Sequence, residues 1–134
     1  MFDESLINGD EFYPDTDDLS NVRLKIRLPW YRTLPLSCVD YVEIDIDGKT
    51  IGRNETSLTL YGQDHSLDEV RSLYKVQWVV LDTADVHVKT GSPLSLGQHK
   101  VKVTLRFRVP YGMGVEFFQV AKCEKSLKLV GRDW

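Results

Sequence analysis

Apolar and polar residues alternate with a period of two along most of the chain. The heptapeptide VRLKIRL at 22–28 sets four aliphatic residues against three basic ones. This spacing is typical of a β-strand with one face in a core and the other in water. The pattern predicts eight strands, at 22–28, 41–51 (with a turn), 57–61, 76–81, 85–90, 99–109, 116–121 and 126–130. Short strands at regular spacing favour an all-β fold, an antiparallel β-sandwich of about eight strands.

Two local signals add detail to this pattern. The dipeptide Asp47-Gly48 interrupts an alternating segment, and it is the favoured pair for a type I′ hairpin turn because both positions need a positive φ. Ser66 and Glu69 have the spacing of a helix capping box. We therefore expect a tight hairpin at 47–48 and one short helical turn before the strand at 76–81.

The strand at 99–109 shows most clearly how the two faces of the sheet differ. One face is predicted to be apolar and to point into the core: Val101, Val103, Leu105, Phe107 and Val109. The other face carries Lys100, Lys102, Thr104, Arg106 and Arg108. Four bases on an outer face discourage edge-to-edge aggregation and also suit an acidic partner. Pro110 should end the strand, because it has no N–H for the ladder.

Composition indicates one domain with an unusual N-terminus. The chain has 134 residues, of which 42% are hydrophobic, which suits a single core. Residues 1–20 carry seven acids and no base, whereas residues 100–134 carry eight bases against three acids. We predict an acidic N-terminal arm at 1–20 and a single β-sandwich domain at 21–134. The arm is either solvated and loosely ordered or attracted to a basic surface.

Several protein classes do not fit this sequence. The longest apolar run, VQWVVL at 76–81, is far too short to cross a bilayer, and the N-terminus does not resemble a secretion signal. The bases alternate with apolar residues along a strand, which does not suggest a nucleic-acid site. We expect a cytoplasmic protein without membrane or nucleic-acid binding, in which Cys38 and Cys123 are thiols rather than a disulfide.

Candidate catalytic and metal-binding groups are scarce. The histidines His65, His87 and His99 show no metal-ligand spacing, and the sequence lacks C-x-x-C, H-E-x-x-H and G-x-S-x-G. The carboxylates Glu43 and Asp45 are explained by a solvated strand face. We therefore predict no catalytic residue, no metal ligand and no cofactor in this chain. A triad assembled across strands stays open as an alternative.

The stretch RLPWYRTLPLSCVD at 27–40 differs from the rest of the chain, because it sets Trp30, Tyr31 and Arg32 between two prolines. Tryptophan, tyrosine and arginine are the residue types that dominate interface hot spots. A loop stiffened by Pro29 and Pro35 loses less entropy when it binds. One interpretation is therefore a loop that faces a partner. The other is a lid in which the two aromatic rings cover an open end of the core.

Three segments together resemble a known family. They are IRLPWYRTLPLSCVDYVEIDIDGKTI at 26–51, KVQWVVLDTADVHVK at 75–89 and LSLGQHKVKVTLRFRVPY at 94–111. In order and spacing they are similar to the small beta subunit of bacterial C-glycoside deglycosidases. With the alternating strand at 22–28, the resemblance covers residues 22–111.

The resemblance implies a β-sandwich that scaffolds a larger alpha subunit. That partner would be a TIM barrel, similar to sugar-phosphate isomerases, with a divalent metal such as manganese and the acid and base residues. The complex would act as a lyase on the C–C bond between a 3-oxo-glucosyl group and a flavonoid-type aglycone, with the substrate bound mainly by the partner. At the partner interface or active-site mouth we expect Pro29, Trp30, Tyr31, Arg32, Pro35 and Tyr111.

Two other functions stay open. In a stand-alone carbohydrate-binding module, Trp30, Tyr31 and Trp78 would stack on sugar rings. In a stand-alone enzyme, the purified chain would be active by itself.

Overall fold

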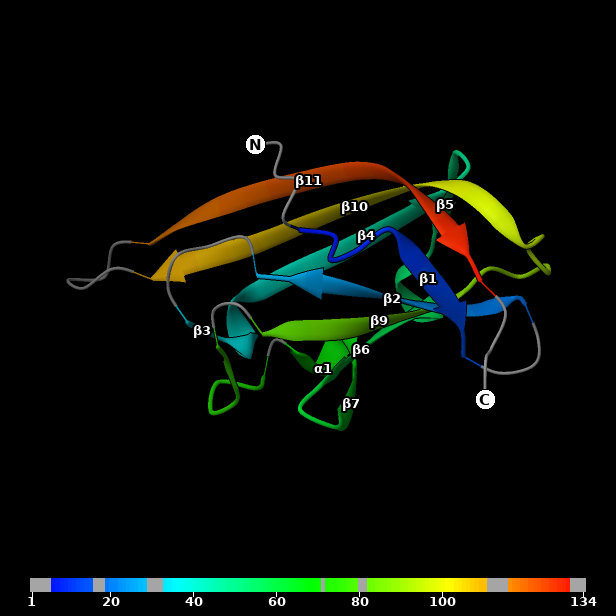
Figure 1. Cartoon of the computed structure of the whole chain (residues 1–134). Coiled ribbons are helices and arrows are strands. Elements are labelled where there is room, and N and C mark those ends of the chain that lie inside the picture. Colours follow the sequence, from blue (N-terminus) through cyan, green and yellow to red (C-terminus); the bar gives the residue numbers. More distant parts are fainter. Residues whose placement is uncertain are drawn as a thin grey trace.

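The computed structural model describes residues 6–15, 19–28, 33–70, 72–79, 82–110 and 116–130. These residues form an all-β fold with one short α-helix, as the sequence predicts (Figure 1). The strands are β1 Glu11–Pro14, β2 Asn21–Arg27, β3 Leu34–Pro35, β4 Val39–Ile46, β5 Lys49–Ile51, β6 Thr56–Leu60, β7 Gln63–Ser66, β8 Gln77–Trp78, β9 Thr83–Lys89, β10 Gly97–Pro110 and β11 Glu116–Leu129. The helix α1 spans Leu67–Val70, and two 3-10 turns span Leu36–Cys38 (η1) and Arg53–Glu55 (η2).

Nine strands form one curled sheet in the order β5-β4-β10-β11-β1-β2-β9-β6-β7. Strand β1 joins its two halves, because Glu11 and Phe12 pair in parallel with β11 while Tyr13 and Pro14 pair antiparallel with β2. The sheet folds over itself, so that β4, β10 and β11 lie across β2, β9 and β6 (Figure 1). The predicted sandwich is thus present as two layers, but the layers are halves of one mixed sheet.

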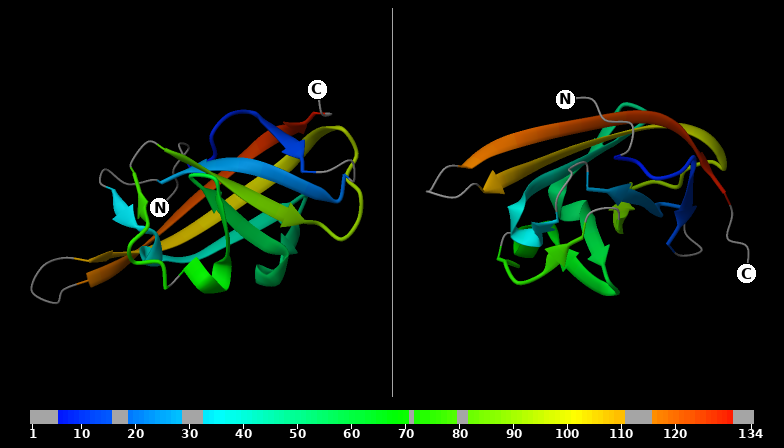
Figure 2. Two further views of the ribbon diagram at one scale, coloured as in Figure 1. Left: turned by 90° about the horizontal axis from the view of Figure 1, so that it is seen from below. Right: turned by 60° about the vertical axis from the view of Figure 1, so that its left-hand side comes forward.

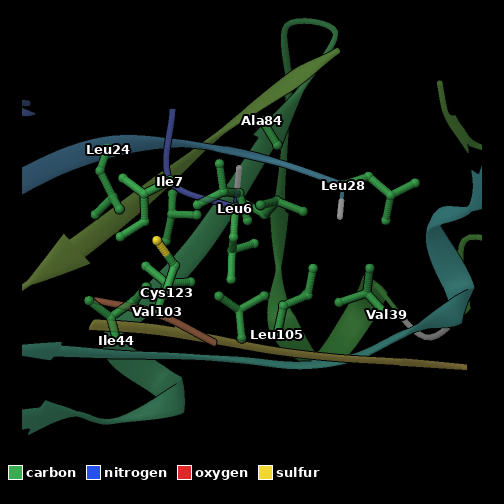
Figure 3. Packing of buried hydrophobic residues seen from close by; sticks show 14 of the residues in the cluster. Leu6, Ile7, Leu24, Leu28, Val39, Ile44, Ala84, Val103, Leu105 and Cys123 are labelled. Atoms are coloured by element: carbon green, nitrogen blue, oxygen red, sulfur yellow. The ribbon is translucent and has the colours of Figure 1, made fainter. Parts of the chain in front are cut away.

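The core lies between these two layers and follows the predicted alternation. Figure 3 shows Leu6, Ile7 and Leu24 of one layer pointing toward Val103 and Leu105 of the other. In β10, all five residues that the sequence assigns to the core are buried: Val101, Val103, Leu105, Phe107 and Val109. The buried thiols of Cys38 and Cys123 are not joined in a disulfide.

The predicted turn and helix start are both confirmed. Asp47 and Gly48 have φ values of 52° and 85°, and they connect β4 to β5 as a type I′ turn requires. Ser66 and Glu69 form the reciprocal pair of a capping box: the Ser66 N–H donates to Glu69 Oε1 at 3.1 Å, and the Glu69 N–H donates to Ser66 Oγ at 3.2 Å. The helix α1 is only four residues long, and none of the helices among the described residues could span a membrane.

Strand boundaries differ most from the prediction at two places, and elsewhere by one or two residues. The strands expected at 116–121 and 126–130 are one strand, β11, because Ala121 and Cys123 continue the buried alternation with small side chains. The strand expected at 76–81 is reduced to β8, which pairs with β3 through Leu34 and Trp78. Residues 80 and 81 lie outside the described part.

The N-terminal segment 6–15 belongs to the sheet, so the solvated-arm interpretation is wrong for these residues. Leu6 and Phe12 have no exposed surface, and Ile7 forms an isolated bridge with Ile26. The physical reason is alternation: the acids at Asp10 and Glu11 face water while Phe12 enters the core. The division of the chain at residue 20 stays a prediction.

Candidate functional site

Of the predicted interface residues, Pro35 alone lies in the described part of the chain. Pro29, Trp30, Tyr31, Arg32 and Tyr111 lie outside it. Pro35 is half-buried in β3, where it pairs with Gln77 of β8. The next residue, Leu36, donates its N–H to the Val76 carbonyl at 2.7 Å. Pro35 is therefore held by a short two-stranded pair rather than by a free loop.

Strand β3 comes soon after residues 29–32 in the sequence, and β10 ends just before Tyr111. In the structure, β3 and this end of β10 lie at one end of the molecule. In Figure 1, β3 and the end of β10 that carries Pro110 are both on the left, and both views of Figure 2 agree. The pairing of β10 with β4 ends at Phe107, whereas its pairing with β11 continues to Pro110. The β10–β11 hairpin thus projects beyond the rest of its layer at this end.

The outer face of this hairpin carries an exposed aromatic ring beneath a guanidinium. Arg106 lies 4.2 Å above the centre of the Phe118 ring, and Phe118 is 47% exposed. The Arg106 Nε also lies 3.4 Å from a carboxylate oxygen of Asp40. A cation over an exposed aromatic ring is typical of interface anchors. Phe118 is not among the predicted interface residues, although the adjacent phenylalanines in EFFQVA cannot both face a core from one strand.

Trp78 is unsuited to stacking on a sugar. It is 1% exposed, and its indole N–H donates to the Asp82 carbonyl at 3.0 Å. Trp78 is therefore a core residue. The carbohydrate-binding alternative keeps two of its three aromatic residues. These two, Trp30 and Tyr31, lie outside the described residues.

His87 has partners that at first suggest a catalytic triad. Its Nδ1 lies 2.6 Å from Asp15 Oδ2, and its Nε2 lies 2.7 Å from Thr59 Oγ1. The Thr59 hydroxyl, however, donates its one proton to a carboxylate oxygen of Asp64. The Thr59 oxygen therefore accepts from His87, which is the opposite of a hydroxyl activated by a base. The group links β9 to β6 and to Asp15, the residue after β1, and it does not form a nucleophile.

His99 is buried, and both of its ring nitrogens form hydrogen bonds. Its Nδ1 donates to Asp47 Oδ2 at 2.5 Å, and its Nε2 donates to the Ser95 carbonyl at 2.6 Å. Burial alone lowers the pKa of His99, but the hydrogen bonds to Asp47 and Ser95 and the Asp47 charge outweigh it, so the pKa is raised. The hydrogen bond from His99, with one from the Lys100 N–H, lowers the pKa of Asp47.

The third histidine also serves the fold. His65 Nδ1 lies 3.2 Å from Glu69 Oε1, the carboxylate that caps α1. Among the described residues, no three His, Cys, Asp or Glu side chains gather closely enough to hold a metal ion. All three histidines therefore contact carboxylates that belong to turns, caps or strand ends.

Comparison with known proteins gives the family. The model of the C-glycoside deglycosidase beta subunit family matches residues 2–111. The chain belongs to this family. The matched range includes β1 to β10 and ends just after Pro110, so β11 lies beyond it.

Three relatives are about one-third identical to this chain over the aligned residues. The 3′-dehydrocarminate deglycosidase beta subunit of a Microbacterium species is 34% identical over 111 residues, which are 83% of this chain and 81% of the relative. The C-glycoside deglycosidase beta subunit of Microbacterium trichothecenolyticum is 33% identical over 92 residues, 66% of each chain. A beta subunit of Arthrobacter globiformis is 33% identical over 91 residues, 67% of this chain and 69% of the relative. The predicted family is confirmed, and these names support a subunit role.

Proposed function

We propose that this chain is the scaffolding beta subunit of a heteromeric C-glycoside deglycosidase. The complex cleaves, as a lyase, the C–C bond between a 3-oxo-glucosyl group and an aromatic, flavonoid-type aglycone. The family match over residues 2–111 carries this proposal. A cytoplasmic location goes with it, and the two thiols that form no disulfide support that location.

The chemistry divides between the two subunits. A ketone at C3 acidifies the proton at C2, so a base can remove that proton while the aglycone leaves as a carbon leaving group. A divalent, manganese-like ion would polarise the carbonyl. We assign the ion and the acid and base residues to the larger TIM-barrel alpha subunit, because the described residues of this chain offer no set of metal ligands. The hydrogen bonds that hold His87 and His99 support this division.

The partner interface lies, in this proposal, at the end of the molecule where β3 and the β10–β11 hairpin meet. It includes Pro35 together with Pro29, Trp30, Tyr31, Arg32 and Tyr111, at or near the active-site mouth. Two observations support the choice of this end. The hairpin projects there (Figure 2), and its outer face carries the exposed Phe118 under Arg106.

Co-expression with an alpha subunit tests the proposal directly. We expect the two proteins to elute together on gel filtration, and we expect a 3-oxo-C-glucoside to be cleaved by the mixture but not by either chain alone. The control is the same alpha subunit expressed without this chain. Separate elution of the two proteins, or cleavage by this chain alone, would contradict the scaffolding role.

A further inference from the structure

A polar cleft lies away from the proposed partner interface. Its volume is about 440 Å³, and its lining comes from β2, β6, β7, β9, α1 and η2 and from Asp15, which follows β1. This volume falls in the range of small-molecule sites, roughly 300 to 1,000 Å³. The cleft includes the C-terminal end of β9, which points away from the Pro110 end of β10 (Figures 1 and 2).

The strand register gathers the lining residues. Ser57 of β6 stands opposite His87 of β9 on one side and opposite Ser66 of β7 on the other. These three residues therefore form a row on the outer face of three adjacent strands. In the next row, Asn21 of β2 stands opposite Lys89 of β9. Residues far apart in the sequence thus converge on one cleft.

Two of these side chains are already fixed by hydrogen bonds. His87 is held between Asp15 and Thr59, and Ser66 is part of the capping box of α1. A binding site whose side chains are held in place by neighbours loses little entropy when a ligand enters. The cleft is therefore organised before any ligand binds.

The chemistry of the lining selects the class of ligand. Of the twelve described lining residues only Leu67 and Val88 are apolar, but carbon atoms of the polar side chains also face the cleft, so its lining suits a ligand that combines hydroxyl groups with C–H surface. Among the described lining residues, the three carboxylates of Asp15, Glu55 and Asp68 outnumber the one lysine ammonium and disfavour an anion. Hydroxyl groups suit this lining, because they donate to carboxylates and accept from amide and ammonium groups.

We propose that this cleft binds a small, neutral, polyhydroxylated molecule of about monosaccharide size. Asn21, Asn54 and Lys89 donate to its hydroxyl oxygens, and the carboxylates accept from its hydroxyl protons. The site goes beyond the scaffolding function, because it lies away from the proposed interface. If no ligand binds in the cleft, the subunit proposal is unaffected. If the subunit proposal is wrong, the cleft can still bind its ligand.

A titration of the full chain with D-glucose, followed by amide NMR, tests the site. We expect saturable shifts of the amides of Ser57, His87 and Lys89, with a Kd on the order of 1 mM, because a ligand of this size gains little free energy per atom. Cyclohexanol, which has a six-membered ring with a single hydroxyl, should shift these amides far less.

Two variants locate the binding. Ser57→Trp should fill the cleft and abolish the saturable shifts, whereas Thr50→Trp, at an exposed position on the edge strand β5, should leave them unchanged. Should Ser57→Trp fail to fold, Lys89→Ala at an exposed position should still weaken binding at least about threefold. The proposal is overturned by glucose shifts that do not saturate at about 50 mM, that Ser57→Trp and Lys89→Ala leave as strong as in the unchanged chain, or that inorganic phosphate reproduces more strongly.

Discussion

The histidines show how the function of a single residue is decided by what its two ring nitrogens contact. At His99 the acceptors are a carboxylate and a backbone carbonyl, and a carbonyl oxygen can only accept. Below its raised pKa, His99 is an imidazolium that donates from both ring nitrogens, and its ring centre lies 5.9 Å from that of Phe12 with the two planes at 86°. This arrangement ties the β4–β5 turn to the residues before β10.

The His99–Asp47 pair should make stability depend on pH. The pKa of His99 is raised above 6.5, so its contribution is present below that value and is lost as the pH rises through the raised pKa. The pKa of Asp47 is lowered below 3.8, so its contribution is present above that value and is lost as the pH falls through the lowered pKa. The pair should therefore stabilise the fold most strongly between about pH 4 and pH 6.5.

Asp47→Asn tests this pair, because asparagine also suits the positive φ of the turn. We expect the free energy of unfolding to fall by about 1 kcal/mol near pH 5.5, and by less as the pH rises through the pKa of His99. Urea unfolding at several pH values measures the difference. Glu43→Gln, an exposed change on β4, the strand that leads into the turn, is the matched control. An equal loss at every pH would show that charge is not the cause.

At the scale of elements, alternation predicts a strand wherever it is uninterrupted and the buried residues are large. It predicts β2, β9 and the full inward face of β10. It divides β11 in two, because the small buried residues Ala121 and Cys123 are less recognisable as core positions. It misses β1, because a high density of acids hides the alternation around Phe12. The local chemistry of turns and caps at 47–48 and 66–69 predicts structure more reliably than strand length does.

Strand β1 offers a test at this scale, because it joins the two halves of the sheet. Phe12 has no exposed surface, whereas its neighbour Tyr13 is 37% exposed. Phe12→Ala should lower the free energy of unfolding by about 3 to 5 kcal/mol, since it leaves a cavity between the layers. Tyr13→Ala should cost under about 1 kcal/mol. If thermal or urea unfolding shows equal effects of the two variants, residues 6–15 do not belong to the core.

At the scale of the whole molecule, function depends on pairings that periodicity does not specify. Asp15 meets His87 across 72 residues, and Asp47 meets His99 across 52. The register of β6, β7 and β9 creates the polar cleft, and the sequence alone gives no register. The family could be predicted because it rests on local motifs. The cleft and the contact of Phe118 with Arg106 could not, because each depends on which strands are neighbours.

The two interpretations of the Trp30–Arg32 segment differ most clearly in the whole complex. If these residues face the alpha subunit, Trp30→Ala and Arg32→Ala should each weaken the complex by about 2 kcal/mol or more, as hot-spot residues do. They should leave the unfolding of the isolated chain nearly unchanged. If the aromatic rings instead cover the core, Trp30→Ala should lower the free energy of unfolding by about 3 kcal/mol or more while the affinity stays the same.

Calorimetric titration of the alpha subunit and urea unfolding of this chain together distinguish these outcomes. Leu96→Ala is the matched control, because Leu96 is a large apolar residue, 58% exposed, just before the start of β10. It lies at the opposite end of that strand from Pro110, so its loss should affect neither measurement. A fall in affinity with Leu96→Ala as large as that with Trp30→Ala would place the partner along the whole hairpin layer rather than at its projecting end.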